Sequence, residues 1–205
     1  MGHMSTSPRV RMTPESRREQ LLDLGIELLA TRSLEDLSIE VLAEEAGISR
    51  GLLYHYFGSK QEFHLAVVRR AADDLIAITA PRDVLDPLEQ LAASVAAYVD
   101  YVEQKHGVYT SLVRAAAGGN EALREVYESA RQTLVDRIFD ISGPERLAEM
   151  GVRDSPAVRM MAHGWATAVE DITLAWIDDH RGLERADLLK ALAGALPGMV
   201  LPVLS

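Results

Sequence analysis

The stretch SIEVLAEEAGISRGLLYHYF, from Ser38 to Phe57, has the pattern of two short helices joined by a tight turn. Ser38 is placed to cap the first helix, whose apolar residues recur at helical spacing. Gly47 can adopt the left-handed geometry that ends a helix, and Ser49 is placed to cap a second helix from Arg50. Such a pair predicts a helix-turn-helix, whose second helix fits the DNA major groove. A tight corner in an ordinary helical protein would give a similar pattern.

The residues on either side of this stretch decide between the two interpretations. Ser59 follows closely, and Glu62 completes a capping box with it. The run AGISRGLLYHYFGSKQEF closely resembles the DNA-binding signature of the TetR family of bacterial repressors. Upstream, RREQLLDLGIELLATRSLEDLSIEVLAEEAG resembles the first two helices of that family. The resemblance is strong from about Arg17 to Val68, and beyond Val68 it lies only in the helical layout.

The resemblance implies an all-α fold and a division of the chain into three segments. Residues 1–12 are expected to form a flexible arm, which starts with the tag remnant Met1-Gly2-His3. Residues 13–72 are expected to form the helix-turn-helix domain, with the motif itself at 38–57. Residues 73–205 are expected to form a ligand-binding and dimerisation domain. The resemblance also implies a homodimer that binds a palindromic DNA operator and is released by a small molecule.

About nine helices are expected, because no stretch alternates with period two for long enough to form a strand. The helix that begins at Lys60 is expected to reach Thr79, where Pro81 ends it. Further on, Gly107 and Gly143-Pro144 are expected to break helices, and Pro197 is expected to kink or break the last one. The other expected helices run from Pro14 to about Ala30, from Asp86-Pro87 to Gly107, from Val108 to Ala117, from Asn120 to Gly143, from Ser155-Pro156 to about Asp179, and from about Arg185 onward.

The composition is that of a soluble globular protein, with 48% hydrophobic and 25% charged residues among 205. The chain has no cysteine, which excludes disulfides and thiolate metal sites and fits a reducing cytoplasm. No apolar segment follows a basic start, so no secretory signal is expected. The apolar stretch from Ala191 contains two prolines and is shorter than a membrane span. A cytoplasmic protein without a membrane segment, cofactor or metal is therefore expected.

The net charge of −10 argues against DNA binding only if it is evenly spread. Up to Lys60 there are seven basic and nine acidic residues, so most of the excess acid lies further along the chain. Phosphate affinity depends on local clusters, such as Arg9, Arg11, Arg17 and Arg18. A solvated tail without a partner remains the alternative for Arg9 and Arg11.

The resemblance assigns DNA-contacting roles residue by residue. Arg50 can donate two hydrogen bonds to a guanine edge, and Gly51 lets the backbone lie close to DNA. Leu52 stands where family members often carry Thr or Ser, so it is expected to meet a thymine methyl instead. Tyr56 and Phe57 are expected to pack in the core. The expected DNA-binding residues are Ser38, Ser49, Arg50, Gly51, Leu52, Tyr54, His55 and Lys60, with Ser38, Tyr54 and Lys60 at phosphate-contacting positions.

The resemblance also implies a ligand pocket among the later helices. The candidates are aromatic residues and the few polar residues on apolar stripes, although an aromatic residue taken alone is more often core than ligand-facing. Glu170 and Asp171 stand on an otherwise apolar helix, and an unpaired buried carboxylate is costly. An apolar or weakly cationic ligand is therefore expected. The candidate ligand-binding residues are Tyr98, Tyr101, Arg114, Tyr127, Met161, His163, Trp165, Glu170 and Trp176.

Two other classes of function were weighed. An enzyme could use His163 and Glu170 with Asp178, Asp179 and His180, but the first two lie about two helical turns apart. The sequence contains no nucleophile elbow, phosphate loop or HExxH motif, so no catalytic residue is expected. A helical adaptor with a vestigial DNA-binding head is the remaining alternative.

The last two long helices are expected to form the dimer contact. The resemblance implies that Pro156–Asp179 and Arg185–Val203 pair with their symmetry mates as a four-helix bundle. Apolar residues lie on more than one side of the first of these helices, so one side needs a cover from elsewhere. On the last helix, small residues would let another helix approach closely. These small residues are Ala191, Gly194, Ala195 and Gly198. A single-chain core that uses both sides is the alternative.

Overall fold

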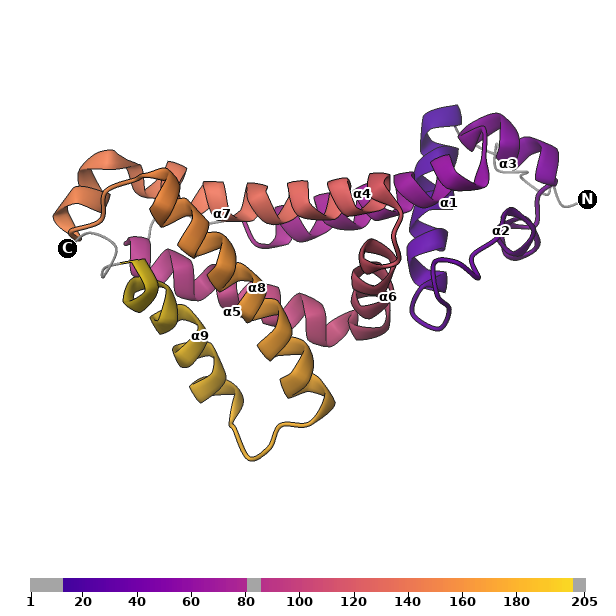
Figure 1. Ribbon diagram of the computed structural model, residues 1–205. Helices are drawn as coiled ribbons and strands as arrows, with labels where there is room; N and C mark the ends of the chain where they lie inside the picture. The colour runs from indigo at the N-terminus through magenta and orange to yellow at the C-terminus, as the bar shows by residue number, and fades with distance from the viewer. Residues whose placement is uncertain (1–12, 81–85, 201–205) are drawn as a thin grey trace, which may run out of the picture.

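The computed structural model describes residues 13–80 and 86–200, and over these ranges it contains nine α-helices and no strand (Figure 1). The prediction of an all-α fold is therefore confirmed. The helices are α1 Pro14–Leu28, α2 Ile39–Ala46, α3 Arg50–Phe57, α4 Lys60–Ile78, α5 Pro87–Gln104, α6 His106–Ala117, α7 Glu121–Glu149, α8 Pro156–Asp178 and α9 Arg185–Val200. The expected arm at residues 1–12, the stop at Pro81 and the end of the last helix at Val203 lie outside the described residues.

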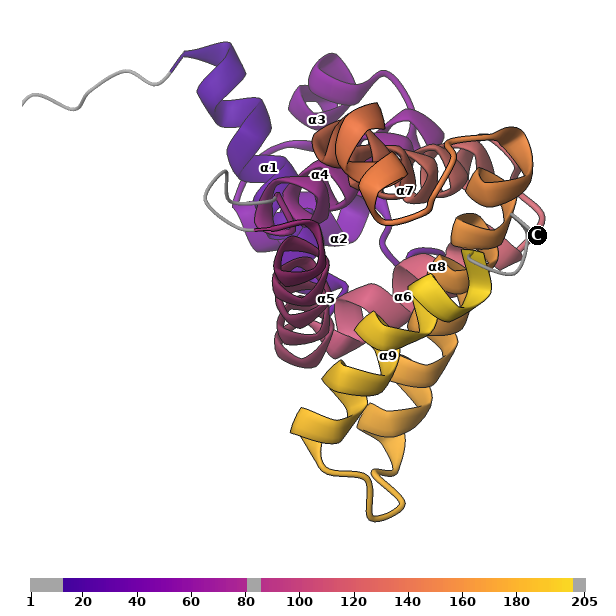
Figure 2. The same cartoon turned by 90° about the vertical axis from the view of Figure 1, so that its left-hand side faces the viewer.

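The molecule is elongated, with α1, α2 and α3 gathered at one end (Figure 1). We call these three helices the head, and we call α5 to α9 the body. Helix α4 leaves the head and packs along α7 for much of its length. Helices α8 and α9 lie side by side on the body (Figure 2). The head therefore connects to the body through α4 and through contacts of α6 with α1.

Side-chain caps start most of the helices where the sequence predicted them. At each of these positions a side-chain oxygen accepts a hydrogen bond from a backbone N–H in the first turn, which satisfies one of the unpaired donors there. The caps are Thr13, Ser38, Ser49, Ser59, Asp86, Asn120 and Ser155. Gly47 ends α2 with φ 63°, as expected for a left-handed helix end.

Gly107 does not break a helix, contrary to the expectation from its position. The chain turns at Lys105, and Gly107 is the second residue of α6. Its role is close packing, because an added Cβ would lie 2.4 Å from the carbonyl oxygen of Ala30 at the end of α1. Only glycine allows this approach of the two backbones.

Two further expected break positions gave different outcomes. Gly143 interrupts α7 as expected, with φ 69° and ψ 159°, and a short helical stretch follows it from Pro144 to Glu149. Pro197 does not end α9, which continues to Val200. Pro197 lacks the N–H that would bond to the carbonyl four residues earlier, so the last turn of α9 has one backbone hydrogen bond fewer.

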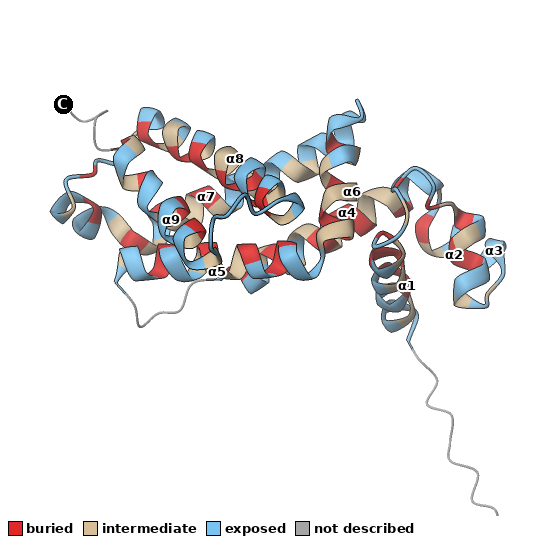
Figure 3. Cartoon of the chain, turned by 90° about the horizontal axis from the view of Figure 1, so that it is seen from below, coloured by how far each residue is buried: buried red, intermediate tan, exposed pale blue. Residues whose placement is uncertain are grey.

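The described residues form separate apolar cores at the two ends of the molecule, and buried residues follow the inner face of each helix (Figure 3). The head core is centred on fully buried side chains such as Leu42, Leu53 and Phe63. The body core joins α5, α7, α8 and α9, and in it Trp165 donates from Nε1 to the Leu192 carbonyl at 2.8 Å. A smaller cluster around Tyr101, Val102 and Tyr109 lies between them.

Candidate functional site

Helix α3 is fixed to the head by the side chains on one of its faces. Leu53 is 0% exposed and Phe57 is 4% exposed, and both pack in the head core. The Phe57 ring meets the Phe63 ring of α4 edge-on at 5.0 Å, and the Arg18 guanidinium lies 5.1 Å from the Phe57 ring centre. Phe57 is in the core as predicted, and Tyr56 is half-buried and packs against the same core. These contacts leave the opposite face of α3 at the surface.

The residues predicted to contact DNA lie at or near this outer face. Seven of them are exposed, and Ser38 is half-buried. The hydroxyls of Ser38 and Ser49 are already used as helix caps. Lys60 donates from Nζ to the Glu35 carbonyl at 2.7 Å, which ties α4 to the loop before α2. The exposed residues are Ser49, Arg50, Gly51, Leu52, Tyr54, His55 and Lys60.

Arg50 and Gly51 are the residues of this face that the fold itself needs least. The Arg50 side chain is 68% exposed, and its closest carboxylate contact is with Glu40 at 3.8 Å. An added Cβ on Gly51 would meet nothing within 4 Å. Packing within the chain therefore gives no reason for a glycine at this position, and close approach of an external molecule would.

A histidine joins α4 to the segment before α2. His64 Nε2 lies 2.6 Å from the Leu37 carbonyl oxygen. Burial lowers the pKa of His64, and the charge on Lys60 lowers it further against the opposing effect of the hydrogen bond to Leu37. The neutral ring, which donates to Leu37, helps to hold α2 and α3 at a fixed angle to α4.

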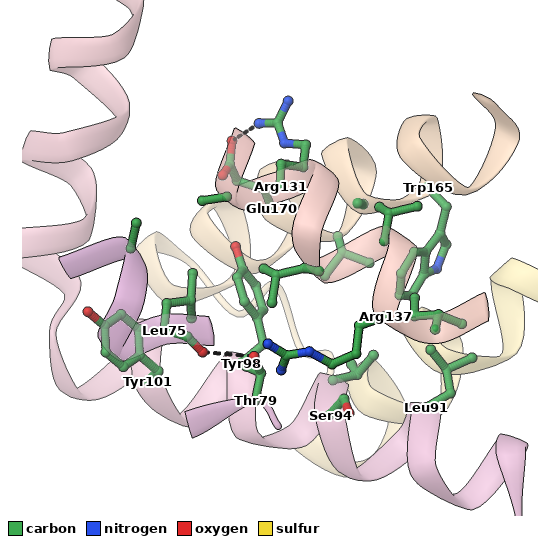
Figure 4. Close-up of a pocket in the computed structure, with 18 of the residues that line it drawn as sticks. Leu75, Thr79, Leu91, Ser94, Tyr98, Tyr101, Arg131, Arg137, Trp165 and Glu170 are labelled. Carbon is green, nitrogen blue, oxygen red and sulfur yellow. Dashed lines mark hydrogen bonds and ion pairs between the residues drawn. The ribbon is translucent and has the colours of Figure 1, made fainter. Parts of the chain in front are cut away.

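A pocket of about 150 Å³ lies between α4, α5, α7 and α8 (Figure 4). Its walls are mainly aliphatic and aromatic, which is typical of small-molecule sites. Five of the nine predicted ligand residues line it, namely Tyr98, Tyr101, Tyr127, Trp165 and Glu170.

The other four predicted ligand residues do not line this pocket. Arg114 is exposed at the end of α6, and Met161 packs against the body core. His163 lies 3.6 Å from Glu128 on the outer side of α7 and α8. Trp176 donates from Nε1 to the Leu183 carbonyl at 2.7 Å and stacks on His180. Helical spacing placed these four on the correct helices, but each faces a different neighbour.

Glu170 is the centre of a buried polar network at one end of the pocket. Tyr109 donates to its Oε2 at 2.6 Å, and Tyr127 donates to the same oxygen. Arg131 donates to Oε1 at 3.0 Å, and Tyr98 and Tyr109 join their hydroxyls at 2.9 Å. Four helices meet here, because Tyr98 is on α5, Tyr109 on α6, Tyr127 and Arg131 on α7 and Glu170 on α8.

The phenols of this network stay protonated at neutral pH. Burial raises the pKa of Tyr98 and of Tyr109 far above the usual value, and burial with the Glu170 carboxylate nearby does the same for Tyr127. Burial also raises the pKa of Tyr101 to about 12. Two neutral hydroxyl donors and one guanidinium therefore satisfy Glu170, which leaves no unpaired carboxylate for a cationic ligand. Asp171 is exposed, so the expectation of a cationic ligand has no support from either residue.

Tyr109, Arg131 and Arg137 are among the pocket residues that sequence reasoning missed. Both arginines interrupt the apolar stripe that passes through Leu134 and Ile138 on α7. A cation on an apolar stripe indicates a buried polar contact or a polar position in a pocket, and this signal was available in the sequence.

The described part of the chain contains no group of three or more side chains suited to hold a metal ion. The cluster considered for an enzyme does not form there, since Glu170 faces the pocket and Asp178 and His180 are exposed. Among the described helices, none has the length and apolar character needed to cross a membrane.

Comparison with known proteins matches both parts of the chain. Residues 21–67 match the family described as bacterial regulatory proteins, tetR family. Residues 87–195 match the family described as tetracyclin repressor-like, C-terminal domain. The second match alone covers more than half of the chain.

Individual relatives are also transcriptional regulators. The transcriptional activator FasR of Mycolicibacterium smegmatis is 26% identical over 177 residues, which are 85% of this chain and 78% of FasR. The transcriptional repressor KstR2 of Mycobacterium tuberculosis is 36% identical over 102 residues, about half of each chain.

Solved structures share the fold. A tetR-family transcriptional regulator from Streptomyces coelicolor has a TM-score of 0.73 at 28% identity, covering 93% of this chain and 90% of that one. A transcriptional regulator from Rhodococcus sp. Rha1, at 22% identity, has a TM-score of 0.70 over 91% of this chain and 96% of its own. With an exposed recognition helix at one end and these matches over both parts, the chain belongs to the TetR family of DNA-binding transcriptional regulators, which are not enzymes.

Proposed function

We propose that the protein is a repressor that binds a roughly palindromic operator as a homodimer and releases it when a small molecule enters the body. In this proposal residues 13–72 bind DNA and residues 73–205 bind the ligand and dimerise. The observation that carries it is the outer face of α3, where Arg50 and Gly51 are exposed without a role in packing. Such a face suits the major groove, and Arg50 suits a guanine edge.

The outer side of α8 and α9 supports dimerisation. Trp165 and Trp176 are buried in the body core, whereas Ile172 of the same helix is 45% exposed. An added Cβ on Gly164, Gly194 or Gly198 would meet nothing within 4 Å. These glycines are not needed for packing within one chain, but they would allow the same helices of a second chain to approach closely. A two-fold pair would place two recognition helices about 34–36 Å apart, or a small multiple of this.

Helix α6 offers a route from the pocket to the head. Tyr109 on α6 donates a hydrogen bond to Glu170 at the pocket. Gly107, two residues earlier on the same helix, packs closely against the Ala30 backbone. Ser111 of the same helix donates to the Arg32 carbonyl at 3.1 Å. A ligand that displaces Tyr109 would therefore shift the contact with α1. The ligand would then bind more tightly to the conformation with the shifted contact than to the DNA-bound one, and such a difference is what allows a ligand to change DNA affinity.

Repression is the simplest consequence of operator binding, because a bound dimer blocks access to the DNA. The relatives include both kinds of regulator: FasR is named as an activator, and KstR2 is named as a repressor. A reporter gene behind the protein's own upstream region, in the bacterial cytoplasm, tests the direction. Expression should fall when the protein is present, and a rise would mean that it is an activator.

The test of DNA recognition uses gel shifts with the protein's own upstream region and with random DNA. Arg50→Ala should cost about 1–3 kcal/mol on the operator and relax preference at one or two base pairs. Lys60→Ala should weaken binding to all sequences alike, although loss of its bond to Glu35 adds some loosening of the head. Arg114→Ala, which removes an exposed arginine of the body, is the control and should change neither.

If the wild-type protein prefers no sequence over random DNA at moderate salt, the protein is not a specific regulator. The helical adaptor with a vestigial head would then be the better description. Equal losses on every sequence for Arg50→Ala would contradict its assignment to base contacts.

The test of dimerisation is Ala195→Glu, which places a charge on the exposed side of α9. Sedimentation should report a monomer, and tight operator binding should be lost together with the dimer. Ala93→Glu on the exposed side of α5 is the matched control and should remain dimeric. Leu196 is unsuited to this test, because it is only 6% exposed and packs within its own chain. A monomeric wild-type protein that still binds a palindrome tightly would contradict the proposal.

A further inference from the structure

A second polar group lies in the pocket apart from the Glu170 network. Arg137 of α7 reaches into the pocket toward Thr79 at the end of α4 (Figure 4). Its Nη1 donates to the Ile76 carbonyl at 2.7 Å, and the side chain is half-buried. A guanidinium has five N–H donors in a planar fork, so one bond to a carbonyl leaves donors for another acceptor.

The positive charge of Arg137 has no carboxylate partner among the described residues. Asp136 and Asp140 flank it on α7, but both pair with Arg159 of α8. At the other polar group of the pocket, Arg131 and Glu170 compensate each other. The described pocket therefore carries one uncompensated positive charge beside apolar walls. A half-buried charge gains most from a partner of opposite sign.

We propose that the ligand is an apolar compound with a single carboxylate, which binds with its acid group on Arg137. The apolar part would lie along Leu91, Val95 and Leu134, which line the same pocket. Two parallel hydrogen bonds from a guanidinium fit a carboxylate well. A cavity of about 150 Å³ holds at least a benzene-sized apolar body, so a medium-length acid is a suitable probe. This inference deepens the proposed function and rests on it for the effect on DNA.

The first experiment measures binding of four probes to the full chain without DNA, by calorimetry at pH 7.5 and fixed salt. The probes are octanoate, octanol, octylamine and octyl phosphate. Octanoate should bind about tenfold or more tightly than octanol, because a hydrogen bond to a charged group exceeds a neutral one, and octylamine should bind most weakly. Equal binding of octanoate and octanol, tighter binding of the amine, or binding of none of the four would overturn the proposal. Tighter binding of octyl phosphate would overturn the carboxylate and indicate a phosphate head instead.

The second experiment assigns the preference to Arg137. Arg137→Met keeps the aliphatic part of the side chain, and it should reduce octanoate affinity to that of octanol while octanol affinity stays nearly constant. Arg137→Lys keeps the charge but not the fork and should retain part of the preference. Arg114→Met, outside the pocket, should retain all of it. An unchanged preference in Arg137→Met or Arg137→Lys would overturn the proposal, and the lysine variant decides if the methionine variant does not fold.

DNA release is then measured separately on operator DNA. If octanoate binds through Arg137 but leaves operator affinity unchanged, the ligand class holds and the proposed release mechanism fails. If octanol releases DNA as well as octanoate does, release holds and the ligand class fails.

Discussion

The head and the body are both helical, but they are stabilised in different ways. In the head, short capped helices close on fully buried side chains such as Leu42, Leu53 and Phe63. In the body, longer helices surround a pocket and share a buried network of charged and phenolic groups around Glu170. The tight packing of the head favours a single conformation. The body contains a cavity and buried hydrogen bonds that a ligand could rearrange. Paired substitutions, one in each region, test this difference.

The largest contrast should come from matched leucine truncations. Leu42→Ala removes a fully buried side chain of the head and should lower the free energy of unfolding by about 3–5 kcal/mol. Leu91→Ala, at the pocket wall, should cost only about 2–3 kcal/mol, because the side chain already borders open space. Denaturant unfolding measures both. Equal losses would mean that the pocket wall is as tightly packed as the head.

Charge pairs should give the next largest contrast. Arg131→Met leaves Glu170 buried without its cation and should cost about 2–3 kcal/mol, somewhat below a fully buried pair because the Arg131 side chain is 15% exposed. Arg32→Met breaks the surface pair with Glu45 and should cost under about 1 kcal/mol. The double variant Arg131→Met/Glu170→Leu should recover part of the loss. No recovery would indicate that Arg131 contributes by packing and not by charge.

Helix caps should have similar energies in the two regions but different consequences. Ser49→Ala and Ser155→Ala each remove a cap and should each lower stability by about 1 kcal/mol. Operator affinity, measured by gel shift, should fall for Ser49→Ala because it loosens the start of α3. Ser155→Ala at the start of α8 should leave it nearly unchanged. A similar fall in operator affinity for the two variants would indicate that the position of α3 depends on the body as much as on the head.

The smallest effect expected is a pH dependence that belongs to the head. The pKa of His64 is lowered in the folded state by burial, so the unfolded chain binds a proton more readily near pH 6.5. Its contribution to stability should be complete above about pH 6.5 and lost as the pH falls through the folded-state pKa. Unfolding of wild type and of His64→Gln between pH 7.5 and 5.5 measures this difference. Parallel pH profiles for the two would contradict it.

The same contrast explains what could be predicted from the sequence. Caps and turns such as Ser38, Gly47 and Ser49 are local, and the residues that form each bond lie within a few positions of one another. The predicted head was therefore correct in its helices and in its anchors. In the body, Tyr109 and Glu170 are 61 positions apart, and the packing of α6 and α8 on α7 brings them together.

Gly107 and Pro197 are two positions where the local signal was incomplete. A glycine at position 107 suggests a helix break, but Gly107 instead allows close packing against Ala30, which lies far away in the sequence. Pro197 lies in the last turn of α9, and the helix continues past it to Val200. For Gly107, tertiary packing decided the outcome, which periodicity does not report.

The contact of Gly107 with Ala30 also has a mechanical consequence. It joins two backbones directly, so no side chain can rotate there to absorb a displacement. The neighbouring contact through the Ser111 hydroxyl can absorb one, because that side chain turns about a single bond. A small movement of α6 therefore reaches the segment that follows α1 undiminished at Ala30 and weakened at Arg32. The junction is stiff at one point and compliant at another less than two turns away, and the stiff point sets how far the head can move.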